Sequence, residues 1–226
     1  MIRMRVIVAA VFAVAAASFG TADAAPLVDI SGGMSITNEA ATTLCSLGAV
    51  GYDDFGNLVG LTAGHCDPGD GAPVYLGLNH KIGPVGTFAT HSATPAGQVP
   101  PLELDYAVIL LDPAKVHPIS TTPNGLRIDH IGPVPRQWNW ACKDGQTTGL
   151  TCGPVWSADG NRVDGYIVVA PGDSGSPLVV GTGLVGFTSR FGYVLPPFMF
   201  NGIHRDLADI ASQGDVIGRG FEPVRD

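Results

Sequence analysis

Basic residues are scarce in this sequence. There are 12 Lys and Arg against 20 Asp and Glu, which gives a formal net charge of −8. A surface that binds nucleic acid needs clustered positive charge to neutralise the phosphates. The composition therefore predicts that nucleic acid is not a partner.

Metal-ligand spacing is also missing, because no CxxC motif occurs among the four cysteines. His65 and Cys66 are adjacent, so in a strand or turn their side chains would diverge instead of meeting on one ion. We expect no metal site, and nothing in the sequence implies a cofactor.

Long apolar runs are absent after residue 24. Before it, Arg3 and Arg5 precede the apolar run Val6–Ala17, and small residues follow at Ala22–Ala24. This order predicts a signal peptide over residues 1–24 and a secreted protein, extracellular or in the cell envelope. An uncleaved anchor is the weaker alternative, because the run is shorter than the roughly 20 residues that span a bilayer. We expect no membrane span after cleavage.

Helical periodicity is scarce as well. The 31 glycines and 18 prolines separate short apolar stretches, which is typical of strands and turns. The stretches are Ala49–Tyr52, Leu58–Thr62, Val74–Leu78, Tyr106–Leu111, Tyr166–Ala170, Leu178–Val180 and Leu184–Thr188. No strand is followed by a helix long enough for a parallel crossover, so the predicted fold class is all-β with antiparallel barrels or a sandwich.

The exception is a helix predicted near the end, over about residues 202–213. Ile203, Leu207 and Ile210 share one face, Asn201 is a plausible N-cap, and Gly214 is a plausible stop. The stretch Val116–Asn124 lacks apolar alternation and is the predicted linker between two halves.

All four cysteines lie in the part expected to be exported, where disulfides are the usual state. Three pairings are possible. The pairing that is most local in sequence joins Cys45 with Cys66 and Cys142 with Cys152.

Residues suited to nucleophilic catalysis occur in three segments. Pro171–Pro177 places Ser174 between glycines that allow a sharp turn with an exposed hydroxyl. A serine needs a general base and a group that orients the base. His65 follows one apolar strand and Asp105 begins another, so both partners are available. Asp112 is a weaker candidate for the orienting acid, because it precedes Pro113 and fits a turn.

The segments TAGHC, LDYAVILL and PGDSGSP resemble the three active-site segments of chymotrypsin-like serine proteases, in the same chain order. The segment Cys142–Gly153 resembles the disulfide loop of the bacterial streptogrisin and alpha-lytic protease branch. The resemblance implies one protease domain over residues 25–226, built from two antiparallel six-stranded β-barrels and a short C-terminal helix. The first barrel would span about residues 30–115 and the second about 125–200.

The resemblance also implies roles for single residues. His65, Asp105 and Ser174 would be the catalytic triad, with the first two in the first barrel and Ser174 in the second. The backbone N–H groups of Gly172 and Ser174 would form the oxyanion hole.

Asp173 would be structural, in a buried ion pair with Lys143. Ser189, Arg190 and Phe191 would line the substrate site, because the segment Gly186–Ser189 resembles the substrate-binding strand of the bacterial branch.

Together these features predict a monomeric, secreted serine endopeptidase that acts on a peptide or protein substrate through an acyl-enzyme. A secreted protein that uses the same fold for binding without catalysis is the alternative from another class. An esterase-like hydrolase is a third possibility, because the acyl chemistry is shared.

Overall fold

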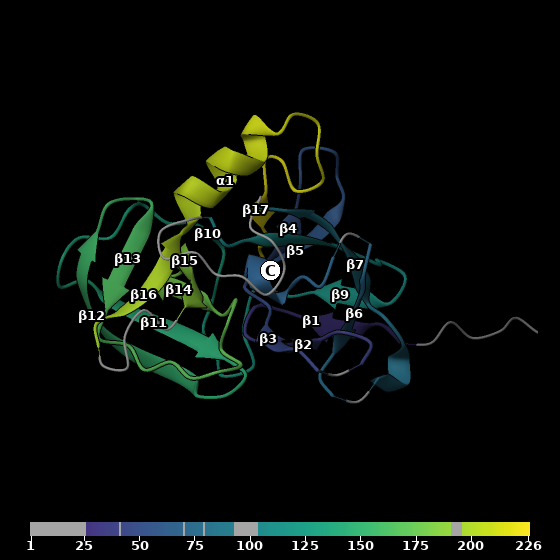
Figure 1. Ribbon diagram of the computed structural model, residues 1–226, viewed down its shortest axis with the longest axis horizontal. Coiled ribbons are helices and arrows are strands. Elements are labelled where there is room, and N and C mark those ends of the chain that lie inside the picture. The colour runs from purple at the N-terminus through teal and green to yellow at the C-terminus, as the bar shows by residue number, and fades with distance from the viewer. Residues whose placement is uncertain (1–25, 41, 70, 79, 93–103, 191–195) are drawn as a thin grey trace, which may run out of the picture.

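The computed structural model describes residues 26–40, 42–69, 71–78, 80–92, 104–190 and 196–226. The predicted signal peptide and Phe191 lie outside the described residues, and so does the side chain of Arg190. Figure 1 shows two β-rich halves side by side, with one helix along an edge of the molecule. The regular structure is almost entirely β-strand, which confirms the predicted all-β fold.

The first half is a curled sheet of eight strands in the order β17-β4-β5-β8-β7-β6-β2-β3. Its strands are β2 (Ser35–Thr37), β3 (Leu44–Ser46), β4 (Ala49–Tyr52), β5 (Leu58–Thr62), β6 (Pro73–Leu76), β7 (Gly86–His91), β8 (Ala107–Leu111) and β17 (Glu222–Pro223). The 3₁₀ turns η1 (Gly64–Cys66) and η2 (His80–Ile82) join them, and a parallel pair of β1 (Val28–Ile30) and β9 (Val116–Pro118) lies beside them.

The second half closes into a barrel, because β15 pairs with both β14 and β16. Its six strands are β11 (Trp140–Gly145), β12 (Gly149–Ala158), β13 (Arg162–Gly165), β14 (Pro177–Val180), β15 (Gly183–Arg190) and β16 (Phe198–Gly202). A short strand, β10 (His130–Ile131), adds to β15, and helix α1 (Ile203–Ser212) follows β16.

One buried cluster joins the halves. Leu61 and Val108 of the first half pack in it with Leu184 and Phe187 of the second and with Ile203 of α1. The fit is close, because a Cβ atom at Gly48 would lie 2.2 Å from the Phe187 ring. Shared burial of this kind fixes the two halves relative to each other, which a site built from both halves requires.

Two local expectations were wrong. The segment Tyr166–Ala170 follows β13 without forming a strand, and the Thr151 hydroxyl donates to the Val168 carbonyl there, at 2.8 Å. Asn201 belongs to β16, and the N-cap of α1 is Gly202, which has no side chain to cap the helix. The predicted stop fits, since Gly214 follows the C-cap Gln213 with a φ of 88°.

Candidate active site

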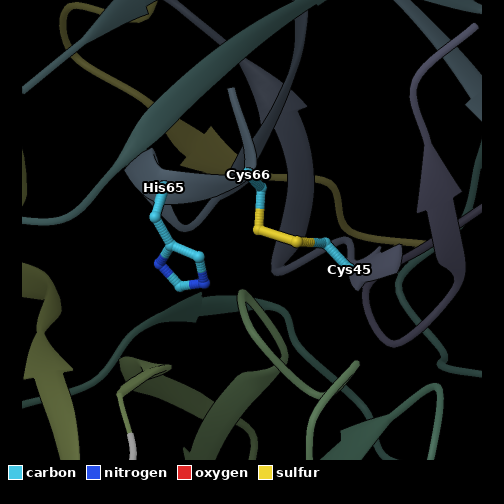
Figure 2. A group of neighbouring side chains, drawn as sticks. All are labelled: Cys45, His65 and Cys66. Carbon is cyan, nitrogen blue, oxygen red and sulfur yellow. A yellow bond between two sulfur atoms is a disulfide. The ribbon is translucent and has the colours of Figure 1, made fainter. Parts of the chain in front are cut away.

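His65 lies in η1, directly after the buried strand β5. The disulfide between Cys45 and Cys66 fastens this turn to β3, with the two Cα atoms 6.2 Å apart. Figure 2 shows the imidazole extending from η1, beside the disulfide, toward the green ribbons of the second half. The imidazole is therefore held at the junction of the halves.

Asp105 reaches His65 because of strand register. β5 and β8 are antiparallel and Thr62 pairs with Ala107, so the end of β5 lies beside the start of β8. Asp105 Oδ2 is 2.9 Å from His65 Nδ1, and the His65 backbone N–H donates to Asp105 Oδ1 at 2.8 Å. With Nδ1 as the donor, Nε2 is left free to accept a proton.

The second half also holds Asp105. The Ser189 hydroxyl of β15 donates to Asp105 Oδ2 at 2.5 Å, and Asn201 Nδ2 of β16 donates to the Asp105 backbone carbonyl at 3.1 Å. Burial acts to raise the pKa of Asp105, but the hydrogen bonds and charge of His65 and the Ser189 hydroxyl hold the pKa below its ordinary value. The carboxyl group is therefore an anion at neutral pH.

Ser174 lies in a turn that approaches the first half closely. The Ser46 backbone N–H donates to the Ser174 carbonyl at 2.7 Å, and the Ser46 hydroxyl donates to the Gly172 carbonyl at 3.0 Å. A Cβ atom at Gly175 would lie 2.2 Å from Thr62 Oγ1, so only glycine fits where the turn meets the end of β5. The turn is thus packed against the strand that leads into His65.

Gly172 has a φ of 100°, a conformation that favours glycine, and a Cβ atom there would lie 2.3 Å from Thr147 Oγ1. The N–H groups of Gly172 and Ser174 donate no hydrogen bond to any other described residue. Two such N–H groups in one turn are available to a substrate oxygen.

Asp173, between them, is fully buried and points into the protein. Its Oδ2 is 3.2 Å from Nζ of Lys143, which is also fully buried. Thr148 donates to the carboxylate through its hydroxyl at 2.7 Å and through its backbone N–H at 3.1 Å. Ala170 donates its N–H at 2.9 Å. Burial opposes the charge on Asp173, but the Thr148 and Ala170 hydrogen bonds and the Lys143 charge hold its pKa below the ordinary value.

The residues expected to bind substrate are only partly described. Ser189 is 8% exposed and its hydroxyl is used by Asp105. The side chains of Arg190 and Phe191 lie outside the described residues. Asp112, the weaker candidate for the orienting acid, is a turn residue that accepts the Ala114 N–H at 3.0 Å.

Cys45, His65 and Cys66 come together in a way that resembles a metal site, since their sulfur and nitrogen atoms lie within 4.8 Å of one another. Both sulfurs are bonded to each other, however, as Figure 2 shows. Metal ligation by cysteine requires a free thiolate, so this group is a disulfide beside a histidine. The second predicted disulfide, Cys142–Cys152, is also present and links β11 to β12.

Sequence reasoning missed Thr148 and Asn201 as contributors to the site. Thr148 is 25 residues from Asp173, and Asn201 is 96 residues from Asp105. A threonine in a glycine-rich loop and an asparagine before a helix have common local uses, so no local pattern indicates these distant partners.

No protein-family model matches the sequence, and no curated protein matches it either. Within the described residues, no helix combines the length and apolar character needed to cross a bilayer.

Solved structures are similar in fold. Protease A of Thermobifida fusca has a TM-score of 0.64 at 19% identity, covering 88% of this chain and 100% of that one. Cellulomonas bogoriensis chymotrypsin has a TM-score of 0.60 at 22% identity, with the same coverage. The scabies mite inactivated protease paralogue S-D1 has a TM-score of 0.51 at 14% identity, covering 85% of this chain and 95% of that one. The chain therefore has the fold of the chymotrypsin-like serine proteases.

Proposed function

We propose that the protein is a secreted serine endopeptidase of the bacterial streptogrisin and alpha-lytic protease branch. The observation that carries the proposal is the His65–Asp105 pair, with Nδ1 2.9 Å from Oδ2, beside the glycine-flanked turn that holds Ser174. Ser174 is the nucleophile, His65 the general base and Asp105 the orienting acid. The substrate is a peptide or protein.

The chemistry proceeds in two stages. Ser174 Oγ attacks the scissile carbonyl while His65 Nε2 takes the hydroxyl proton and then gives it to the leaving amine. Water, activated by the same imidazole, hydrolyses the resulting acyl-enzyme. Asp105, an anion through its hydrogen bonds, stabilises the imidazolium that forms in each stage.

The developing oxyanion is bound by the N–H groups of Gly172 and Ser174. A donor of this kind stabilises the transition state by about 3 kcal/mol in related acyl transfer. The buried Lys143–Asp173 pair holds the Asp173 carboxylate inside the protein. There Asp173 accepts hydrogen bonds from Ala170 of its own loop and from Thr148 of the turn between β11 and β12, which ties the two segments together.

The proposal includes export from the cytosol, which the two disulfides support. Disulfides persist in oxidising compartments outside the cytosol, and this chain has Cys45–Cys66 and Cys142–Cys152. Residues 1–24 would be the signal that directs export. We propose that the mature protein acts as a monomer.

Hydrolysis of an unfolded protein tests the proposal. The mature chain should cleave it internally, with new amino termini identified by mass spectrometry, and Ser174→Ala should remove this activity. Comparison of an ester with the matching amide separates an esterase from a peptidase, since an esterase would hydrolyse the ester alone.

A binding protein without catalysis is the second candidate, because one structural neighbour is described as an inactivated protease paralogue. If the folded mature chain cleaves no peptide in a broad peptide library, the binding protein is favoured over the endopeptidase.

A further inference from the structure

Asp206 is a buried acid that the proposed mechanism does not use. It lies in the first turn of α1 and is 2% exposed. Its Oδ2 atom has no hydrogen-bond partner among the described residues. A buried carboxylate oxygen without a partner is costly, so its presence needs a physical reason.

The surroundings of Asp206 contain the candidate catalytic acid. Helix α1 follows β16 directly and packs on Tyr106, the residue after Asp105, in the buried cluster that joins the halves. Neighbouring polar groups have partners, since Asp209 of α1 accepts a hydrogen bond from the Tyr106 hydroxyl at 2.6 Å, and Gln213, the C-cap of α1, donates to the same hydroxyl at 2.6 Å. Asp206 differs from these residues, because it is buried and its Oδ2 atom accepts no hydrogen bond from a described residue.

Charge makes the ionised form of Asp206 unfavourable. Burial raises its pKa well above the ordinary value, and the negative charges of Asp105, from the start of β8, and Asp209, from its own helix, add to this. Arg205 opposes the shift, and Tyr106 also faces Asp206 electrostatically. The side chains that reach Asp105 from β15 and β16, Ser189 and Asn201, carry no charge.

We propose that Asp206 is a positioning residue that acts through Asp105, carrying a proton in the active protein so that Asp105 is the one negative charge behind His65. When hydroxide removes this proton, a second negative charge is buried beside Asp105. Repulsion between the two buried carboxylates then disturbs the packed position from which Asp105 orients His65 and stabilises the imidazolium. The inference rests on the proposed peptidase function and deepens it, because it assigns the alkaline limit of activity to a named group.

The proton on Asp206 also makes the free energy of unfolding depend on pH. An aspartic acid in an unfolded chain has a pKa of about 3.9. Because the folded pKa is higher, the folded state binds one more proton than the unfolded state between these two values. The stabilisation of the folded state by the Asp206 proton is thus fully present below about pH 4 and is lost as the pH rises toward the folded pKa.

Asp206→Asn tests the proposal, because the amide has the same shape and stays neutral. The pH profile of kcat/KM should keep its acidic limb, and its alkaline limb should move up by at least one pH unit. Asp215→Asn, an exposed acid after the same helix, is the matched control and should move neither limb. A shifted acidic limb would mean that Asp206 is charged in the active protein, and an unmoved alkaline limb would mean that Asp206 does not set it. Either result overturns the proposal.

Two further measurements do not depend on activity, so they separate this inference from the proposed function. In protein labelled with ¹³C at the Asp side-chain carboxyl, the Asp206 resonance, assigned by its loss in Asp206→Asn, should show a protonated acid at pH 7. The stability difference between Asp206→Asn and the wild type should increase with pH above about pH 4. An ionised resonance at pH 7, or a stability difference that does not change with pH, would contradict the inference even if peptides are cleaved.

Discussion

At the scale of single residues, the site depends on buried charges whose partners come from distant parts of the chain. Asp105 is held by His65 from the first half and by Ser189 and Asn201 from the second. Asp173 is held by Lys143, Thr148 and Ala170. Asp105 therefore depends on the packing of the two halves, whereas the partners of Asp173 all lie in the second half.

Replacement of Lys143 by methionine should nearly abolish peptide hydrolysis. It leaves Asp173 buried without its cation, at a cost of about 3 to 5 kcal/mol in the free energy of unfolding. Chemical denaturation and kcat/KM measure the two effects. Lys115→Met, at a lysine that is 40% exposed, is the control and should cost less than about 1 kcal/mol. Full activity in Lys143→Met would refute the role given to the ion pair.

Ser189→Ala should lower kcat about tenfold or more with little change in KM. The hydroxyl donates to Asp105 at 2.5 Å, and a hydrogen bond to a charged group is typically worth about 1.5 to 3 kcal/mol. Steady-state kinetics on a short peptide separate the two parameters. A rise in KM at constant kcat would instead support the substrate-binding role that the sequence predicted for Ser189.

Local patterns in the sequence indicated the candidate catalytic residues, and the family resemblance also implied the Lys143–Asp173 ion pair, which the structure contains. The hydroxyl and amide groups that hold the buried acids were not predictable. A histidine after a strand, an acid before a strand and a serine between glycines are visible in short segments. The contact between Ser189 and Asp105 spans 84 residues and depends on the docking of the two halves. A hydroxyl or amide can serve many partners, so its residue type does not indicate which one it meets.

At the scale of the elements, strands that carry an apolar stretch were predictable and irregular segments were not. Ala49–Tyr52 and Leu58–Thr62 match β4 and β5 at both ends. Tyr166–Ala170 has the composition of a strand, yet its backbone is held by hydroxyls such as that of Thr151 instead of by a strand ladder. The β-propensity of a segment indicates only a preference for extended backbone. Tertiary contacts decide whether that backbone pairs with a sheet.

The two disulfides should contribute to stability in similar amounts but to activity in different amounts. The loops they close span 21 and 10 residues, and the loop-entropy model gives about 3 kcal/mol for each. Cys45→Ala/Cys66→Ala also frees η1, which holds His65, and should therefore lose more kcat/KM than Cys142→Ala/Cys152→Ala. Equal losses of activity would show that the turn is held by other contacts.

At the scale of the whole molecule, the acids make opposite contributions to the pH dependence of folding. The pKa values of Asp105, Asp173 and Asp53 are lowered by hydrogen bonds and neighbouring charges, although burial acts the other way. Their contribution is present above the unfolded pKa of about 3.9 and is lost as the pH falls through the lower folded values. Burial raises the pKa of Asp206, so its contribution is lost as the pH rises.

The free energy of unfolding should therefore fall below about pH 4. Asp53→Asn should reduce this fall, because Asp53 accepts hydrogen bonds from Asn57 and Gly218 only as part of a folded loop. Denaturation by urea between pH 2 and pH 6 measures how steeply the free energy of unfolding changes with pH in each protein. A slope that is the same in wild type and variant would mean that Asp53 does not titrate differently on folding.

The central claim is that Ser174 is an activated nucleophile. Its most direct test is reaction of the folded mature chain with a biotinylated fluorophosphonate, followed by mass spectrometry to locate the adduct. The account predicts an adduct at Ser174 that is lost in Ser174→Ala and strongly reduced in His65→Ala. Absence of an adduct in folded wild-type protein, or equal labelling of the His65→Ala variant, would contradict it.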